Sequence, residues 1–160
     1  MVFTVHLYLM LIPVFIQVVR GCPNGWTEYG DSCYMAFFDT QDWSAASTTC
    51  HEKNSYLAEV GDEQENGFLT RLVSTHQSHE SYWLGGNDIF VEGDWRWEES
   101  HLVMNYTNWR HGQPDNHHNH NDDCLQAQFT GYTFMWSDVP CTANRNYICE
   151  ASRGNWIQLG

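Results

Sequence analysis

The sequence predicts a secreted α+β domain with two helices, several short strands and one long loop, cross-linked by three disulfides. Three observations lead to this expectation: an apolar N-terminal segment, six cysteines that all follow it, and a stretch from Glu98 to Asp123 without a recognisable regular element. A chain of 160 residues is long enough for one domain of ordinary size. We find no internal repeat, low-complexity linker or second domain in the sequence.

Residues 1–21 are typical of a secretory signal peptide. Residues 2–19 are almost entirely apolar, and Val19 and Gly21 precede a cleavage point before Cys22 at the spacing that cleavage requires. An uncleaved membrane anchor is the alternative, but the run is short for a bilayer span, and nothing later in the sequence is apolar enough. We therefore expect a secreted, extracellular protein.

The charge of the chain excludes several classes of partner. The formal net charge is −13, and loss of residues 1–21 removes only Arg20, which leaves 6 basic and 20 acidic residues and a net charge of −14. Such a chain is not expected to bind nucleic acid or an anionic membrane. It can bind cations, although an acidic surface also serves solubility alone.

The cysteines predict a disulfide framework. An even number of cysteines in a secreted chain favours three disulfides, and the sequence alone permits fifteen pairings. A zinc site is the competing interpretation, but no Cys-x-x-Cys pair is present. The six residues are Cys22, Cys33, Cys50, Cys124, Cys141 and Cys149.

Both predicted helices lie in the first half of the mature chain. Residues 22–33 are expected to form a hairpin and residues 34–38 a strand. A helix is then expected over residues 39–53, which carry apolar side chains at helical spacing. A second helix is expected to open at Asp62, because an acidic N-cap followed by Glu65 forms a capping box.

The second half is expected to consist of short strands and loops. The Glu98–Asp123 stretch is long for a structureless loop in a compact domain, and such loops are usually functional. Residues 138–144 are expected to be a second loop, and residues 151–160 a C-terminal tail. The expected strands cover residues 82–86, 95–97, 124–129, 133–136 and 147–150.

Oxygen-bearing side chains gather in these two loops. Gln113, Pro114 and Asp115 stand in a row, Asp122 comes two residues before a cysteine, and Asp138 follows later. Carboxylate and amide oxygens are the ligands that calcium prefers. The pattern favours a calcium site.

The order of these motifs resembles the C-type lectin-like domain in its long form, especially the perlucin-like proteins of molluscs. The resemblance covers residues 22–150 and implies the C-type lectin-like fold, with two helices flanking small antiparallel sheets and a long calcium-binding loop. The motifs are the six cysteines, Trp83-Leu84-Gly85-Gly86, Glu92-Gly93, Trp95, Trp97 and Gln113-Pro114-Asp115.

The resemblance implies a disulfide pattern and a metal site. It pairs Cys22 with Cys33, Cys50 with Cys149, and Cys124 with Cys141, and it implies a cis bond before Pro114. It makes Ca²⁺ the cofactor. The implied calcium ligands are Gln113, Asp115, Asp122 and Asp138, and an auxiliary ion can be held by Asp88, Glu92, Asn116 and Asp123. Solvated loop acids are the alternative interpretation of the auxiliary group.

The resemblance also implies a carbohydrate partner. In this family two sugar hydroxyls complete the calcium shell, and the order of donors and acceptors around the ion selects their geometry. A Gln-Pro-Asp order implies galactose or N-acetylgalactosamine. The sugar-binding residues implied are Gln113, Asp115, Asp122, Ser137 and Asp138.

The sequence departs from the family pattern at three positions. Ser137 stands where the family usually has Asn, Asp122 where it often has Glu, and His117 follows the motif where strong galactose binders often carry Trp. A mannose-type site, or a C-type domain that binds no sugar, therefore remains open.

Two further features lie in or near the long loop. The four histidines can bind zinc or copper, or respond to pH near 6.5, although exposed loop polarity is the simpler interpretation. Asn105 heads a glycosylation sequon, Asn105-Tyr106-Thr107. The histidines are His111, His117, His118 and His120.

The expected function is secreted, calcium-dependent recognition of galactose-type glycans, including microbial ones, in innate immunity. Weak single sites would require multivalency, for example in a homo-oligomer. The alternative is a shell-matrix protein of perlucin type with a role in biomineralisation. An enzyme is not expected, because the sequence shows no nucleophile with a paired base.

Overall fold

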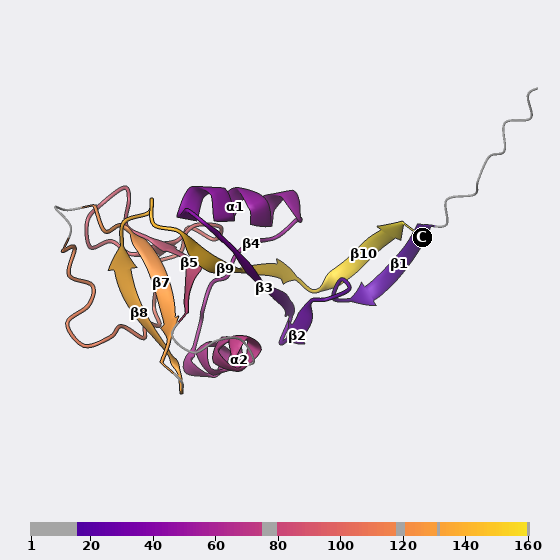
Figure 1. Ribbon diagram of the computed structural model, residues 1–160. Coiled ribbons are helices and arrows are strands. Elements are labelled where there is room, and N and C mark those ends of the chain that lie inside the picture. The colour runs from indigo at the N-terminus through magenta and orange to yellow at the C-terminus, as the bar shows by residue number, and fades with distance from the viewer. Residues whose placement is uncertain (1–15, 75–79, 118–120, 131, 160) are drawn as a thin grey trace, which may run out of the picture.

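The computed structural model describes residues 16–74, 80–117, 121–130 and 132–159. Two helices and a mixed sheet confirm the predicted α+β class (Figure 1). The main sheet has the order β2-β3-β9-β5-β7-β8, with β4 beside β9 and β6 beside β5. Its strands are β2 (Thr27–Tyr29), β3 (Ser32–Gln41), β4 (Tyr56–Leu57), β5 (Ser81–Asn87), β6 (Arg96–Trp97), β7 (Cys124–Phe129), β8 (Phe134–Val139) and β9 (Arg145–Ser152).

The two helices lie on different sides of strands β3 and β9 (Figure 1). Helix α1 (Trp43–Glu52) packs Trp43, Ala46 and Cys50 into a cluster with the core residues of β5 and β9. Helix α2 (Glu63–Val73) buries its apolar stripe in the larger core cluster. Each helix therefore closes one of the two hydrophobic clusters.

The N-terminus of α2 agrees in outline with the predicted capping box. The Asp62 carboxylate accepts a hydrogen bond from the Glu65 N–H at 2.8 Å. The Glu65 carboxylate reaches back to the N–H of Gly61, at 2.7 Å, which lies one residue before the N-cap. This pairing satisfies donors that the first helical turn would otherwise leave unbonded.

Several expected boundaries differ from the structure, and three of the differences are more than a shift of an end. Residues 39–41 belong to β3, and α1 begins only after Asp42, whose carboxylate caps the Ala45 N–H at 2.8 Å. Asp138 lies inside β8, in register with Leu125, and not in a loop. Residues 154–159, expected in a tail, form β10 (Gly154–Leu159).

Strand β10 pairs antiparallel with β1 (Ile16–Gly21), and this ribbon projects away from the rest of the domain (Figure 1). The first 15 residues of the predicted signal peptide lie outside the described residues. In the described part of the chain no helix has the length and apolar character needed to cross a membrane.

The disulfides join the pairs that the resemblance implies. Cys22 is bonded to Cys33, Cys50 to Cys149 and Cys124 to Cys141. The second bridge links α1 to β9, and the third links β7 to the loop after β8. Together they tie the two ends of the domain and the base of the long loop to the sheet.

Candidate functional site: an acidic pocket beside strand β8

The long loop is anchored against β8 by its tryptophan. The Arg110 N–H donates to the Trp136 carbonyl at 2.8 Å, and the Trp136 N–H donates to the Asn108 carbonyl at 2.9 Å. The Trp109 ring packs edge-on against Trp95 and Trp136, with centroids 4.8 and 6.0 Å away. Because these contacts fix residues 108–110 against β8, the Gln113-Pro114-Asp115 motif that follows lies beside the same strand.

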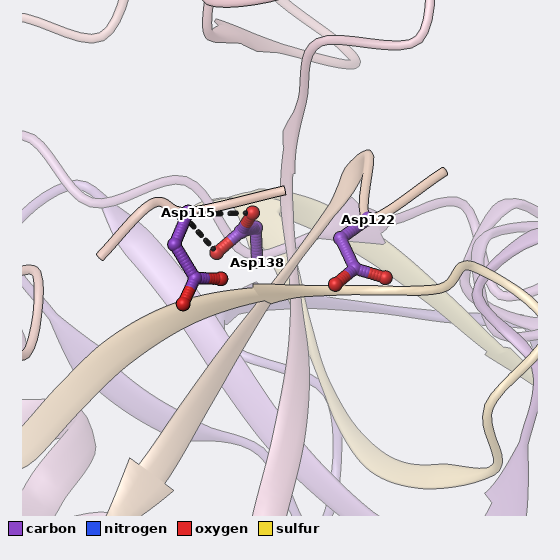
Figure 2. Close-up of side chains that lie close together, drawn as sticks. All are labelled: Asp115, Asp122 and Asp138. Carbon is purple, nitrogen blue, oxygen red and sulfur yellow. Dashed lines mark hydrogen bonds between the residues drawn. The ribbon is translucent and has the colours of Figure 1, made fainter. Parts of the chain in front are cut away.

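Three carboxylates converge where the loop meets β8. Oxygen atoms of Asp115, Asp122 and Asp138 all lie within 4.8 Å of one another. Asp122 and Asp138 are buried, whereas Asp115 is exposed. Figure 2 shows the Asp138 carboxylate between the other two. Two like charges at this separation repel each other by a few kcal/mol at the effective dielectric constant of a protein surface. A bound cation would offset this repulsion.

Backbone amides hold Asp138 in place. Its carboxylate accepts the Asp115 N–H at 3.0 and 3.1 Å and the Asn116 N–H at 2.5 Å. The Gln113 side-chain oxygen accepts the Asp138 N–H at 3.2 Å. The peptide bond between Gln113 and Pro114 is cis, as the resemblance implies. Hydrogen bonds in both directions therefore join the loop motif to strand β8.

The separations fit one calcium ion. Calcium binds oxygens at about 2.3–2.6 Å, so two oxygens on opposite sides of one ion lie about 5 Å apart. The 4.8 Å limit within Asp115, Asp122 and Asp138 meets this requirement. Gln113 adds an amide oxygen on the same wall. These four side chains would hold the ion, which would supply charge neutralisation and vacant positions for ligand oxygens.

The carboxylates open onto a pocket of about 230 Å³. Ser137 lines it but carries no amide group, and Gln126 of β7 lines it from the directly paired position. Gln126 is not among the site residues predicted from the sequence. The sequence does contain a signal for it, because Gln126 is a polar residue between the apolar Leu125 and Ala127 in a predicted strand. The full lining comprises Arg110, Gln113, Asp115, His117, Asp122, Gln126, Ser137, Asp138 and Val139.

The predicted auxiliary group gathers beside this pocket. The Asn116 side-chain N–H donates to Glu92, and the Asn116 side-chain oxygen accepts the Asp122 N–H at 3.2 Å. The Asp88 N–H donates to the Asp123 carbonyl at 3.1 Å. The Asp88 Oδ1 atom is buried and has no hydrogen-bond partner among the described residues. An unbonded buried carboxylate oxygen fits a cation at this position.

The pKa values of two of these acids are raised. Burial raises the pKa of Asp88 to about 6, opposed by the Gly93 N–H and reinforced by Glu92, Asp123 and Asp138. Burial, followed by the charges of Asp122 and Asp138, raises the pKa of Asp123. Without a cation these carboxylates are therefore held ionised at a cost that comes first from burial and then from mutual repulsion.

We expect Asp88 to make the stability of the calcium-free protein depend on pH. Because its folded pKa of about 6 exceeds the unfolded value of 3.8, the folded state binds more protons between these values. In chelator, the stability of the wild type should thus rise relative to Asp88→Asn as pH falls from 7 to 4, by up to about 3 kcal/mol. Urea unfolding of both proteins across this range measures the difference. A constant difference would contradict the assignment.

The remaining predicted residues are only partly described. His117 lines the pocket, and His111 is exposed. His118 and His120 lie outside the described residues. Asn105 is exposed, as a glycosylation site requires.

Comparisons with known proteins give the class. Residues 39–151 match the family model of the lectin C-type domain. The chain is 33% identical over 131 residues to a perlucin-like protein of Mytilus galloprovincialis, covering 81% of this chain and 82% of the relative. It is 32% identical over 153 residues to the galactose-specific lectin nattectin of Thalassophryne nattereri, covering 92% and 94%.

Solved structures share the fold. The carbohydrate-recognition domain of the mouse scavenger receptor C-type lectin matches with a TM-score of 0.74 and 29% identity, over 83% of this chain and 99% of that chain. A calcium-independent type II antifreeze protein matches with a TM-score of 0.72 and 26% identity, over 85% and 96%.

The chain belongs to the C-type lectin family, whose members bind carbohydrate and are generally not enzymes. Within the family it is similar to perlucin and to perlucin-like proteins.

Proposed function

We propose that this chain is a secreted lectin that binds galactose or N-acetylgalactosamine through calcium, and that it recognises glycans, microbial ones included, in innate immunity. The observation that carries the proposal is the convergence of Gln113, Asp115, Asp122 and Asp138 on one pocket. The Gln-Pro-Asp order supports the galactose type, and so does the similarity to a lectin described as galactose-specific.

The chemistry of the proposed site follows from its donors and acceptors. A carboxylate accepts hydrogen bonds only, whereas an amide both donates and accepts. Gln113 therefore offers an amide at one end of the motif and Asp115 a carboxylate at the other. A pair of sugar hydroxyls has to match this order, and exchanging the two ends should reverse the preferred geometry.

We expect Gln113→Glu combined with Asp115→Asn to shift binding from galactose toward mannose. The double change keeps the number of acidic groups and exchanges their positions, so calcium binding should persist. Retention of wild type and variant on galactose and mannose resins, in calcium and in chelator, measures the shift. Failure of the wild type to bind either resin in calcium would contradict the proposed function. Equal galactose retention by both proteins would contradict the role of the motif.

A matrix role in mineralised tissue is the second candidate. The net charge of −13 and the similarity to perlucin favour it. An acidic surface binds mineral through many dispersed charges, whereas a lectin depends on one site. Adsorption to calcium carbonate that survives Asp115→Ala would support the matrix role, and sugar retention lost in the same variant would support the lectin.

Secretion and glycosylation belong to the same proposal. Export directed by residues 1–21 would place the three disulfides in an oxidising compartment, where they persist. Asn105 is exposed and available for a glycan. The mass of the protein secreted from eukaryotic cells, before and after enzymatic deglycosylation, tests both points.

A further inference from the structure

Ser137 belongs to a chain of hydrogen bonds that runs from the sheet to the pocket. The Arg145 Nε–H donates to the Gln126 side-chain oxygen at 2.6 Å. The Gln126 Nε2–H donates to the Ser137 hydroxyl oxygen at 2.9 Å, in a buried contact. Gln126 and Ser137 are directly paired across β7 and β8, so their side chains share one face of the sheet.

Arg145 fixes the direction of this chain of hydrogen bonds. A guanidinium group has donors and no acceptor, so only the oxygen of the Gln126 amide can face it. The Gln126 nitrogen must then face Ser137, whose oxygen accepts. Arg145 itself is held by a second hydrogen bond, from Nη1 to the Asn144 carbonyl at 2.8 Å, and by stacking over Trp83 at 5.8 Å.

The orientation at Ser137 has a consequence for the pocket. A hydroxyl group has one proton, and Ser137 accepts its neighbour's hydrogen bond without using that proton. Ser137 and Gln126 both line the pocket, so the proton is available to an acceptor there. Gln126 engages one of the two lone pairs of the Ser137 oxygen, which leaves the proton and one lone pair for the pocket.

We propose that Gln126, oriented by Arg145, is a specificity-determining residue that fixes the Ser137 hydroxyl as a hydrogen-bond donor to a ligand oxygen. This inference rests on the proposed sugar-binding function. The Ser137 side chain is too short to carry an amide group, and Gln126 on the neighbouring strand places one beside it. Arg145 acts only through Gln126 and is a positioning residue.

Three variants separate this role from a structural one. Ser137→Ala removes the donor, and Gln126→Met removes the amide while nearly keeping the volume. Gln126→Glu keeps a partner for Arg145 but can only accept, which forces the Ser137 proton away from the ligand. Gln64→Met is the matched control, because Gln64 is exposed on helix α2 and lies outside the pocket lining.

Calcium affinity and galactose affinity are measured separately by titration calorimetry, with thermal unfolding as the test of folding. Each of the three variants is expected to lower galactose affinity about tenfold, and calcium affinity should stay within about twofold or tighten in Gln126→Glu. The double variant Gln126→Met/Ser137→Ala should be no worse than Ser137→Ala, because both changes break one chain. The control should bind both ligands like the wild type.

The outcomes that overturn the inference are distinct. If Ser137→Ala lowers calcium affinity as much as galactose affinity, Ser137 acts through the ion and not as a hydrogen-bond donor to the ligand. If Gln126→Met or Gln126→Glu binds galactose like the wild type, Gln126 does not determine specificity. If the wild type binds calcium but neither galactose nor mannose, the proposed function itself fails, and the inference falls with it.

Discussion

Asp138→Asn is expected to weaken calcium binding by about 100-fold or more and to abolish calcium-dependent sugar retention. Asp138 lies between the other two carboxylates (Figure 2) and is buried, so no other acidic side chain of the cluster can take its place. An asparagine retains one oxygen for the amides of Asp115 and Asn116 but loses the charge that attracts the ion. Calcium titration of the variant measures the loss.

The control for this experiment is Asp31→Asn, which removes the same charge at an exposed position. It should bind calcium like the wild type. In chelator Asp138→Asn removes one of three like charges but also one of the two oxygens that accept backbone N–H groups, so urea unfolding of the variant accompanies the titration. Wild-type calcium affinity in Asp138→Asn would show that the carboxylate cluster is not the metal site.

Replacing Cys50 and Cys149 with alanine is expected to cost about 5 kcal/mol of the free energy of unfolding in the chain-entropy model. The two cysteines are separated by 99 residues and are fully buried, and their bond joins α1 to the central strand β9. A loss of this size approaches the whole stability of an ordinary domain. Urea unfolding under non-reducing conditions measures it.

The Cys22–Cys33 bond supplies the matched comparison. Its residues are separated by 11 positions, and the same model gives a cost of about 3 kcal/mol for its removal. The double alanine variant at Cys50 and Cys149 should therefore be less stable than that at Cys22 and Cys33 by roughly 2 kcal/mol. Equal costs would show that loop-closure entropy does not govern the framework.

The sequence allowed prediction of those features that depend on local chemistry or on family motifs. The Asp62 cap and the apolar stripe of α2 follow from neighbouring residues, and the structure contains both. Trp83 and Trp136, whose large apolar rings favour burial, lie fully buried in the core. The disulfide pairing needed the resemblance, because the cysteine spacing alone left fifteen possibilities.

Other features depend on contacts between distant segments. Residues 39–41 extend β3 because β9 pairs with this strand as far as the Gln41–Arg145 contact, and no local pattern reports that partner. Asp138 belongs to β8 because β7 pairs with it. Gln126 joins the pocket because its directly paired neighbour is Ser137. Which polar side chains line the site is therefore decided by strand register.

Cleavage of the predicted signal peptide would change the surroundings of strand β10. Strand β10 is paired from Gly154 with Gly21 to Leu159 with Ile16, and all of its partners precede the expected cleavage point. Processing before Cys22 would remove that partner strand and strip the backbone of residues 154–159 of its hydrogen bonds. A bare strand edge is a template for another chain. The mature chain would therefore present residues 154–159 without the partner strand that they have in the full-length chain.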